Sequence, residues 1–163
     1  MEMLLFKIGG DTYGVKLVDV DEVLHMPTLR SIPSAPLFLA GVLNLRGALI
    51  PVIDMLERLG QHRMQAPPPL GLQESPQSPY PAGTRLLLTA DGDFRFAVIM
   101  DGWQGIRELD EQSYREGILT ELGKSPFING INIGDEGMIQ RVLLRKLLHD
   151  EERSLLLNQQ GEK

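Results

Sequence analysis

The side chains that most often perform catalysis or bind metals are scattered along this sequence rather than grouped. His25, His62 and His149 are the three histidines. None has a partner at the i, i+4 spacing by which two histidines on one helix share a zinc ion. The chain contains no cysteine, which excludes disulfides, thiolate nucleophiles and thiolate-bound metals. The sequence therefore predicts neither a metal site nor a cofactor.

Two further patterns resemble known ligand-binding loops only in part. Asp19, Asp21 and Glu22 crowd together, but the EF-hand register, with its central glycine and a ligand at the last position, is missing. Gly41–Gly47 has the glycine spacing of a P-loop start, yet Ala48-Leu49 follow where a Lys-Ser or Lys-Thr must contact phosphate and magnesium. Nucleotide binding is not expected, and no GxSxG motif supports an enzyme.

The overall charge of the chain limits its partners. The formal net charge is −6 and the isoelectric point is near 5.1, whereas nucleic-acid binding rests on clustered lysines and arginines. The apolar stretch Met1–Ile8 carries Glu2 and Lys7 and meets Gly9-Gly10 too early for a membrane span. We expect a cytoplasmic protein with no nucleic-acid partner and no direct membrane contact.

Short apolar runs separated by turn residues predict an all-β fold. Leu4–Ile8 and Tyr13–Val18 are separated by a glycine-rich turn, and Leu39–Leu45 and Ala48–Ile53 are separated by Arg46-Gly47. Each arrangement is typical of a β-hairpin.

Helices are expected to be few. Asp54 occupies the N-cap position of a short helix that ends at Gly60. Apolar residues at near-helical spacing favour a second helix over Asp110–Lys124. A last hairpin is expected over 127–144, followed by a leucine-rich helix over 147–157.

A proline-rich linker over residues 61–83 divides the chain into two similar halves. Leu5–Val15 matches Leu88–Val98 without a gap, and Phe38–Val42 matches Phe127–Ile131 in the same order. The repeat predicts two β-barrels in series, the first over residues 10–60 and the second over 84–148.

Arg46 is the strongest candidate for partner recognition. It lies beside Gly47 at a hairpin reversal, where a guanidinium on a rigid edge could hold a carboxylate through two hydrogen bonds. The alternative is an ordinary exposed strand arginine. Gly41 likewise has two interpretations. It permits a bulge or a close backbone approach, or it leaves room for a partner helix.

The segment Gly41-Val-Leu-Asn-Leu-Arg-Gly47, with Ile50-Pro-Val-Ile-Asp54 and Leu56-Glu-Arg-Leu-Gly60 after it, closely resembles the signature of the CheW family. These are coupling proteins of bacterial chemosensory arrays. Phe96–Gly102 supports the resemblance, which covers about residues 3–157. It implies that residues 1–163 form a single CheW-like domain, all-β, with two SH3-like five-stranded β-barrels side by side and short helices after the hairpins.

The resemblance also implies a function. CheW-like proteins are non-catalytic adaptors without cofactors, which couple the cytoplasmic tip of chemoreceptors to the regulatory domain of a CheA-type histidine kinase. They are recruited to membrane receptor arrays through these partners. Receptor contact in the family falls in a groove between the barrels. The positions that match receptor-binding or kinase-binding elements of the family are Val20, Glu22, Gly41, Asn44 and Arg46.

Two points remain open at the level of sequence. Glu22 and Arg46 could pair with each other and hold the guanidinium in one orientation. The alternative function is an auxiliary CheW-like protein, of a pilus or other chemosensory system, that binds only one of the two partners.

Overall fold

The computed structural model describes residues 1–61, 80–116, 127–134 and 137–161. Most of the predicted linker, residues 62–79, lies outside this part of the chain. The strands are β1 (Glu2–Ile8), β2 (Asp11–Lys16), β3 (Glu22–His25), β4 (Leu39–Leu45), β5 (Ala48–Asp54), β6 (Arg85–Asp91), β7 (Phe94–Met100), β8 (Trp103–Glu108), β9 (Tyr114–Glu116), β10 (Ile128–Gly134) and β11 (Gly137–Val142). The helical elements are η1 (Leu17–Asp19), α1 (Met55–Arg58), η2 (Glu111–Ser113), η3 (Leu144–Lys146) and α3 (Asp150–Gly161). The predicted all-β class is confirmed.

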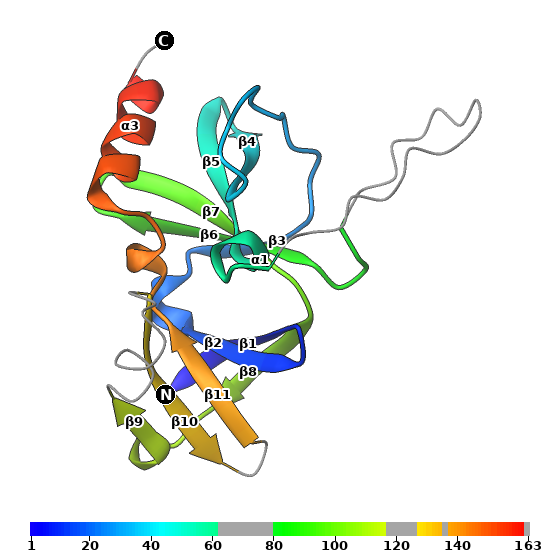
Figure 1. Cartoon of the computed structure of the whole chain (residues 1–163), viewed down its shortest axis with the longest axis vertical. Helices are drawn as coiled ribbons and strands as arrows, with labels where there is room; N and C mark the ends of the chain where they lie inside the picture. Colours follow the sequence, from blue (N-terminus) through cyan, green and yellow to red (C-terminus); the bar gives the residue numbers. More distant parts are fainter. Residues whose placement is uncertain (62–79, 117–126, 135–136, 162–163) are drawn as a thin grey trace, which may run out of the picture.

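The strands form two sheets, which lie one above the other in Figure 1. Sheet A has six strands in the order β8-β1-β2-β11-β10-β9, and sheet B has five in the order β3-β6-β7-β5-β4. The pairs β1–β2, β4–β5, β6–β7 and β10–β11 are antiparallel hairpins, whereas β2 runs parallel to β11 and β7 runs parallel to β5. Each parallel pair joins strands from opposite halves of the chain.

The two sheets have equivalent strand orders. In each sheet, the first hairpin of one half of the chain lies beside the second hairpin of the other half. Hairpin β1–β2 joins β10–β11 in sheet A, and hairpin β6–β7 joins β4–β5 in sheet B. The internal repeat therefore appears as matching hairpins. The predicted division into one barrel over residues 10–60 and another over 84–148 is wrong, because each sheet takes strands from both halves.

Sheet B begins with β3 and ends with β4 in its strand order, and the segment that follows β3 pairs with β4. After β3 the chain crosses to β4, where the Arg30 amide donates to the Val42 carbonyl at 3.0 Å and the Val42 amide donates to the Arg30 carbonyl at 2.8 Å. In sheet A, β9 takes the same place on β10, with Arg115 opposite Ile131. Both sheets thus curl toward a barrel.

The core explains why the strands are uninterrupted apolar runs. On β1, Leu4 and Phe6 face the layer between the sheets, while Met3 and Leu5 face a smaller cluster on the other side of sheet A. Side chains alternate across a strand, so a strand buried on both faces needs apolar residues at every position. Strand β7 follows the same rule, with Phe96, Val98 and Met100 between the sheets and Ala97 and Ile99 on the far side.

Two helix predictions need correction. The helix expected over Asp110–Lys124 is wrong as far as residue 116, because the Asp110 carboxylate accepts from the Gln112 amide at 2.9 Å and caps the short η2 before β9 begins. Residues 117–124 lie outside the described part. The C-terminal helix begins at Asp150 rather than at 147, since η3 first turns the chain so that Leu147 and Leu148 are buried. Within the described residues, no helix has the length and apolar character needed to cross a membrane.

Candidate functional site

The β4–β5 hairpin ends in a tight turn that presents Arg46 to solvent. Arg46 has φ 52° and Gly47 has φ 86°. Two successive positive φ values define the type I′ turn that suits the twist of a two-residue hairpin. The Asn44 side-chain oxygen accepts from the Gly47 amide at 3.2 Å and fixes the turn. The predicted hairpin is confirmed, and Arg46 lies at its tip, exposed.

The absence of a side chain at Gly41 permits a close contact within the fold. A Cβ atom at this position would lie 2.5 Å from the Arg30 carbonyl oxygen, and the β4–β5 register shifts between Leu39 and Gly41. The glycine therefore lets the segment after β3 approach β4, which is the close backbone approach expected of a strand glycine.

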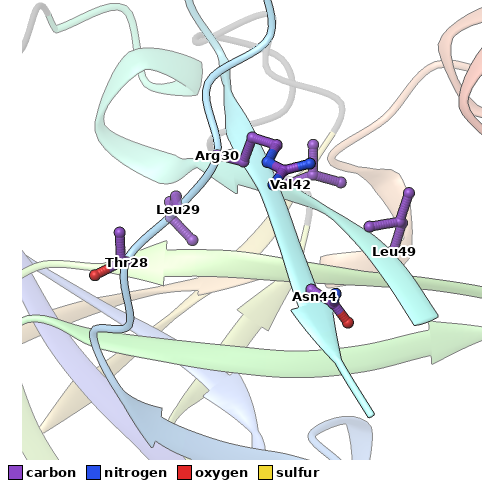
Figure 2. A pocket seen from close by; sticks show the side chains of 6 residues that line it. All are labelled: Thr28, Leu29, Arg30, Val42, Asn44 and Leu49. Carbon is purple, nitrogen blue, oxygen red and sulfur yellow. The ribbon is translucent and has the colours of Figure 1, made fainter. Parts of the chain in front are cut away.

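A cavity of ≈ 360 Å³ lies beside this contact, and Figure 2 shows the side chains around it. The segment after β3 contributes Thr28, Leu29 and Arg30, and the hairpin contributes Val42, Asn44 and Leu49. Leu49 is 53% exposed, so an apolar side chain stands next to an exposed amide and an exposed guanidinium. This surface can bury an apolar group while donating hydrogen bonds to acceptors at its rim.

Glu22 lies on a different strand of sheet B, and Val20 lies just before that strand. Val20 follows η1, donates its amide to the Leu17 carbonyl at 3.1 Å and packs against the core between the sheets. Glu22 begins β3, opposite Leu88 of β6, and is exposed. Strands β3 and β4 stand at opposite ends of the strand order of sheet B. The described ion pairs do not include a pair of Glu22 with Arg46, which the sequence had left open.

A second cavity, the junction groove, lies next to Val20 and Glu22, where the two sheets meet. It encloses ≈ 300 Å³ and takes its walls from η1, the β6–β7 turn and η3. Val18 lines it and is 85% exposed. The Thr89 hydroxyl donates to the Asp19 carbonyl at 2.7 Å and ties the groove's walls together. Val18 was not a candidate from sequence, where it reads as the end of a strand.

Metal binding has no visible donor set in the described ranges, where histidine, aspartate and glutamate side chains do not gather in groups of three. What the described surface offers is an exposed hairpin tip and a groove between two barrel-like sheets. The fold and these surfaces define a β-rich protein-interaction module.

The comparisons with known proteins identify the family. The model of the CheW-like domain matches residues 2–152, and the chain belongs to this family. It is 25% identical over 163 residues to the chemotaxis protein CheW of Klebsiella aerogenes, covering 96% of this chain and 87% of that protein. It is 27% identical over 127 residues to the protein PilI of Pseudomonas aeruginosa, covering 77% of this chain and 64% of PilI.

The fold is shared with a solved structure. The crystal structure of the scaffolding protein TtCheW from Thermoanaerobacter tengcongensis superposes with a TM-score of 0.74 at 25% sequence identity, covering 91% of this chain and 87% of that chain. The two curled sheets therefore correspond to the two SH3-like barrels of the CheW fold.

Proposed function

We propose that this chain is a non-catalytic adaptor that couples chemoreceptors to a CheA-type histidine kinase in a bacterial chemosensory array. The observation that carries the proposal is the family match over residues 2–152. The shared fold with a scaffolding protein supports it. An adaptor needs surfaces rather than catalytic groups, and its mechanism is the simultaneous binding of two partners.

The separation of the candidate residues suits this role. Val20 and Glu22 are next in sequence to residues that line the junction groove. Asn44 lines the cavity at the β4–β5 hairpin, whose tip is Arg46, and the two cavities share no lining residue. A receptor tip is a helical hairpin, whose polar side chains can meet the mainly polar lining of the junction groove while an apolar one contacts the exposed Val18. The Arg46 guanidinium can meet a carboxylate of a partner domain. Two separate surfaces allow both partners to bind at once.

The adaptor reaches the membrane through its partners. We place it in the cytoplasm, where the receptor tips and the kinase regulatory domain lie. Its net charge of −6 disfavours direct adsorption to an anionic bilayer surface. Recruitment to the array then depends on these two partners.

A pull-down with separate partner fragments tests the proposal. The cognate receptor tip and the kinase regulatory domain are each immobilised and incubated with the chain. We expect both to retain it, and the kinase fragment to be retained on receptor beads only when the chain is present. Retention by neither fragment would overturn the proposal.

A second function is favoured by the likeness to PilI, a relative whose name is not CheW. In this alternative the chain is an auxiliary CheW-like protein, of a pilus or other chemosensory system, that binds only one of the two partners. The same pull-down separates the alternatives, because retention by one fragment alone supports the auxiliary role.

A further inference from the structure

An apolar groove lies between α3 and the loop that precedes β4, and it shares no lining residue with the two cavities described above. This groove, the α3 groove, encloses ≈ 310 Å³. Phe38 lines it from the loop and Leu39 from the start of β4, and Leu155 and Leu156 line it from α3. Leu155 is 66% exposed, and Leu37, next to Phe38, is 70% exposed. Exposed leucines beside an apolar depression are typical of a partner surface.

The free charge beside the α3 groove is acidic. The first turn of α3 is Asp150, Glu151 and Glu152. Glu151 is exposed and precedes Leu155 by four residues, so both lie on the same side of the helix. The facing loop, residues 31–39, contains no charged residue.

Arg58 contacts the lining of the groove, and its charge is already engaged. The Arg58 guanidinium pairs with Glu152, donates through Nε to the Leu147 carbonyl at 2.7 Å, and lies 3.9 Å from the centre of the Phe38 ring. Its side chain is only 14% exposed. Arg58 therefore holds α3 against the loop, and Asp150 and Glu151 remain to attract a cationic partner.

The backbone of the loop favours a helical occupant over an added strand. Pro33 and Pro36 have no amide hydrogen. The Ala35 amide donates to the Ile32 carbonyl at 3.3 Å, and the Leu39 amide donates to the Pro36 carbonyl at 3.0 Å. An added strand would find few free donors here. A helix satisfies its own backbone and needs only apolar contact along one face.

We propose that the α3 groove docks an amphipathic helix whose apolar face is flanked by lysines or arginines. The apolar face packs between Phe38 and Leu155, which line the groove, and the basic residues pair with Asp150 and Glu151. This activity goes beyond the adaptor function, since it requires neither receptor nor kinase. It gives the chain a third protein-binding surface.

The test uses the full chain and a fluorescent synthetic peptide of about 14 residues, built from leucine and lysine at helical spacing. A matched peptide has glutamate in place of lysine. We expect the lysine peptide to raise its anisotropy on binding. Leu155→Glu should weaken this binding about tenfold or more, since it replaces apolar burial with a carboxylate facing the peptide's leucines.

The control is Ile106→Glu, which changes a comparably exposed leucine-sized residue (52%) on β8 and should leave peptide binding unchanged. Raising the ionic strength from about 0.05 M to about 0.5 M should weaken binding by the lysine peptide. Equal binding by Leu155→Glu and the unmodified chain would overturn the proposal. So would equal binding of the glutamate and lysine peptides.

Discussion

Arg141 of β11 lies directly beside Gly14 of β2 in the parallel pairing that joins the two halves of sheet A. Arg141 is only 5% exposed. Its Nε donates to the Asn132 side-chain oxygen at 2.7 Å, and its guanidinium lies 3.8 Å from the centre of the Tyr114 ring. Burial lowers the pKa of this guanidinium, although Tyr114 and Glu111 oppose the shift. The space beside Gly14 itself is filled by Met3, Leu5 and Ile139, whose side-chain carbons lie 3.0, 3.1 and 3.2 Å from the position of an added Cβ.

The equivalent position in sheet B is apolar. There Val52 of β5 lies beside Ala97 of β7, and Leu43 occupies the place that corresponds to Asn132. Replacing Asn132 alone by leucine removes the acceptor of a buried guanidinium and should lower the free energy of unfolding by about 3 to 5 kcal/mol. The double variant Asn132→Leu/Arg141→Val carries the residues of sheet B and should unfold at least as late in urea as the unmodified chain. A double variant as unstable as the single one would contradict this.

A substitution at Gly41 tests whether this glycine has a structural role. Gly41→Ala places a methyl group 2.5 Å from the Arg30 carbonyl oxygen, which should lower the free energy of unfolding by about 2 to 4 kcal/mol. Gly10→Ala is the matched control, because Gly10 also has a positive φ, 89°, but nothing within 4 Å of an added Cβ. Gly10→Ala should lower the free energy of unfolding by only about 1 kcal/mol. Similar unfolding midpoints for the two variants would show that the contact at Gly41 is unimportant.

Tyr13 makes stability depend on alkaline pH. Burial raises the pKa of its hydroxyl above the ordinary value of 10.0, the Asp11 carboxylate adds to the shift, and a hydrogen bond with Gln140 opposes it. Between pH 10 and the higher folded pKa, the folded state keeps a proton that the unfolded state has lost. Stability is therefore complete below about pH 10 and falls as the pH rises through the folded pKa.

The variant Tyr13→Phe isolates this effect. Phenylalanine keeps the stacking on Phe6, whose ring centre lies 5.5 Å away, but has no proton to lose. Urea midpoints measured from about pH 8 to about pH 11 should fall more steeply for the unmodified chain than for the variant. Parallel curves would rule out Tyr13 as the cause.

Local features of the fold were predictable from sequence. Arg46-Gly47 predicted the hairpin reversal. Asp54 predicted the helix cap, and its carboxylate accepts a hydrogen bond from the Leu56 amide at 3.1 Å. These elements depend on residues close together in the chain. The exchange of hairpins was not predictable, because the parallel contacts of β2 with β11 and of β5 with β7 join distant residues through backbone bonds that leave no sequence pattern.

The candidate site shows the same limit. The family resemblance indicated five residues but not their arrangement, and the structure places Glu22 on β3 and Asn44 on β4, which are not neighbours in the strand order of sheet B. It also assigns Gly41 to a backbone contact. Val18 became visible only through its exposure at the junction of the two sheets, since exposure depends on the packing of distant elements.

The most direct test of the adaptor function measures how much kinase regulatory domain is retained on receptor-tip beads as the chain is added. We compare the unmodified chain with Arg46→Ala, in which alanine bears the same positive φ, and measure the thermal midpoint of each. Bridging by the unmodified chain is expected, with a loss of about tenfold or more for the variant and little change in its midpoint, because Arg46 is exposed. Absence of bridging by the unmodified chain, or equal bridging by the variant, would contradict the proposed coupling through Arg46.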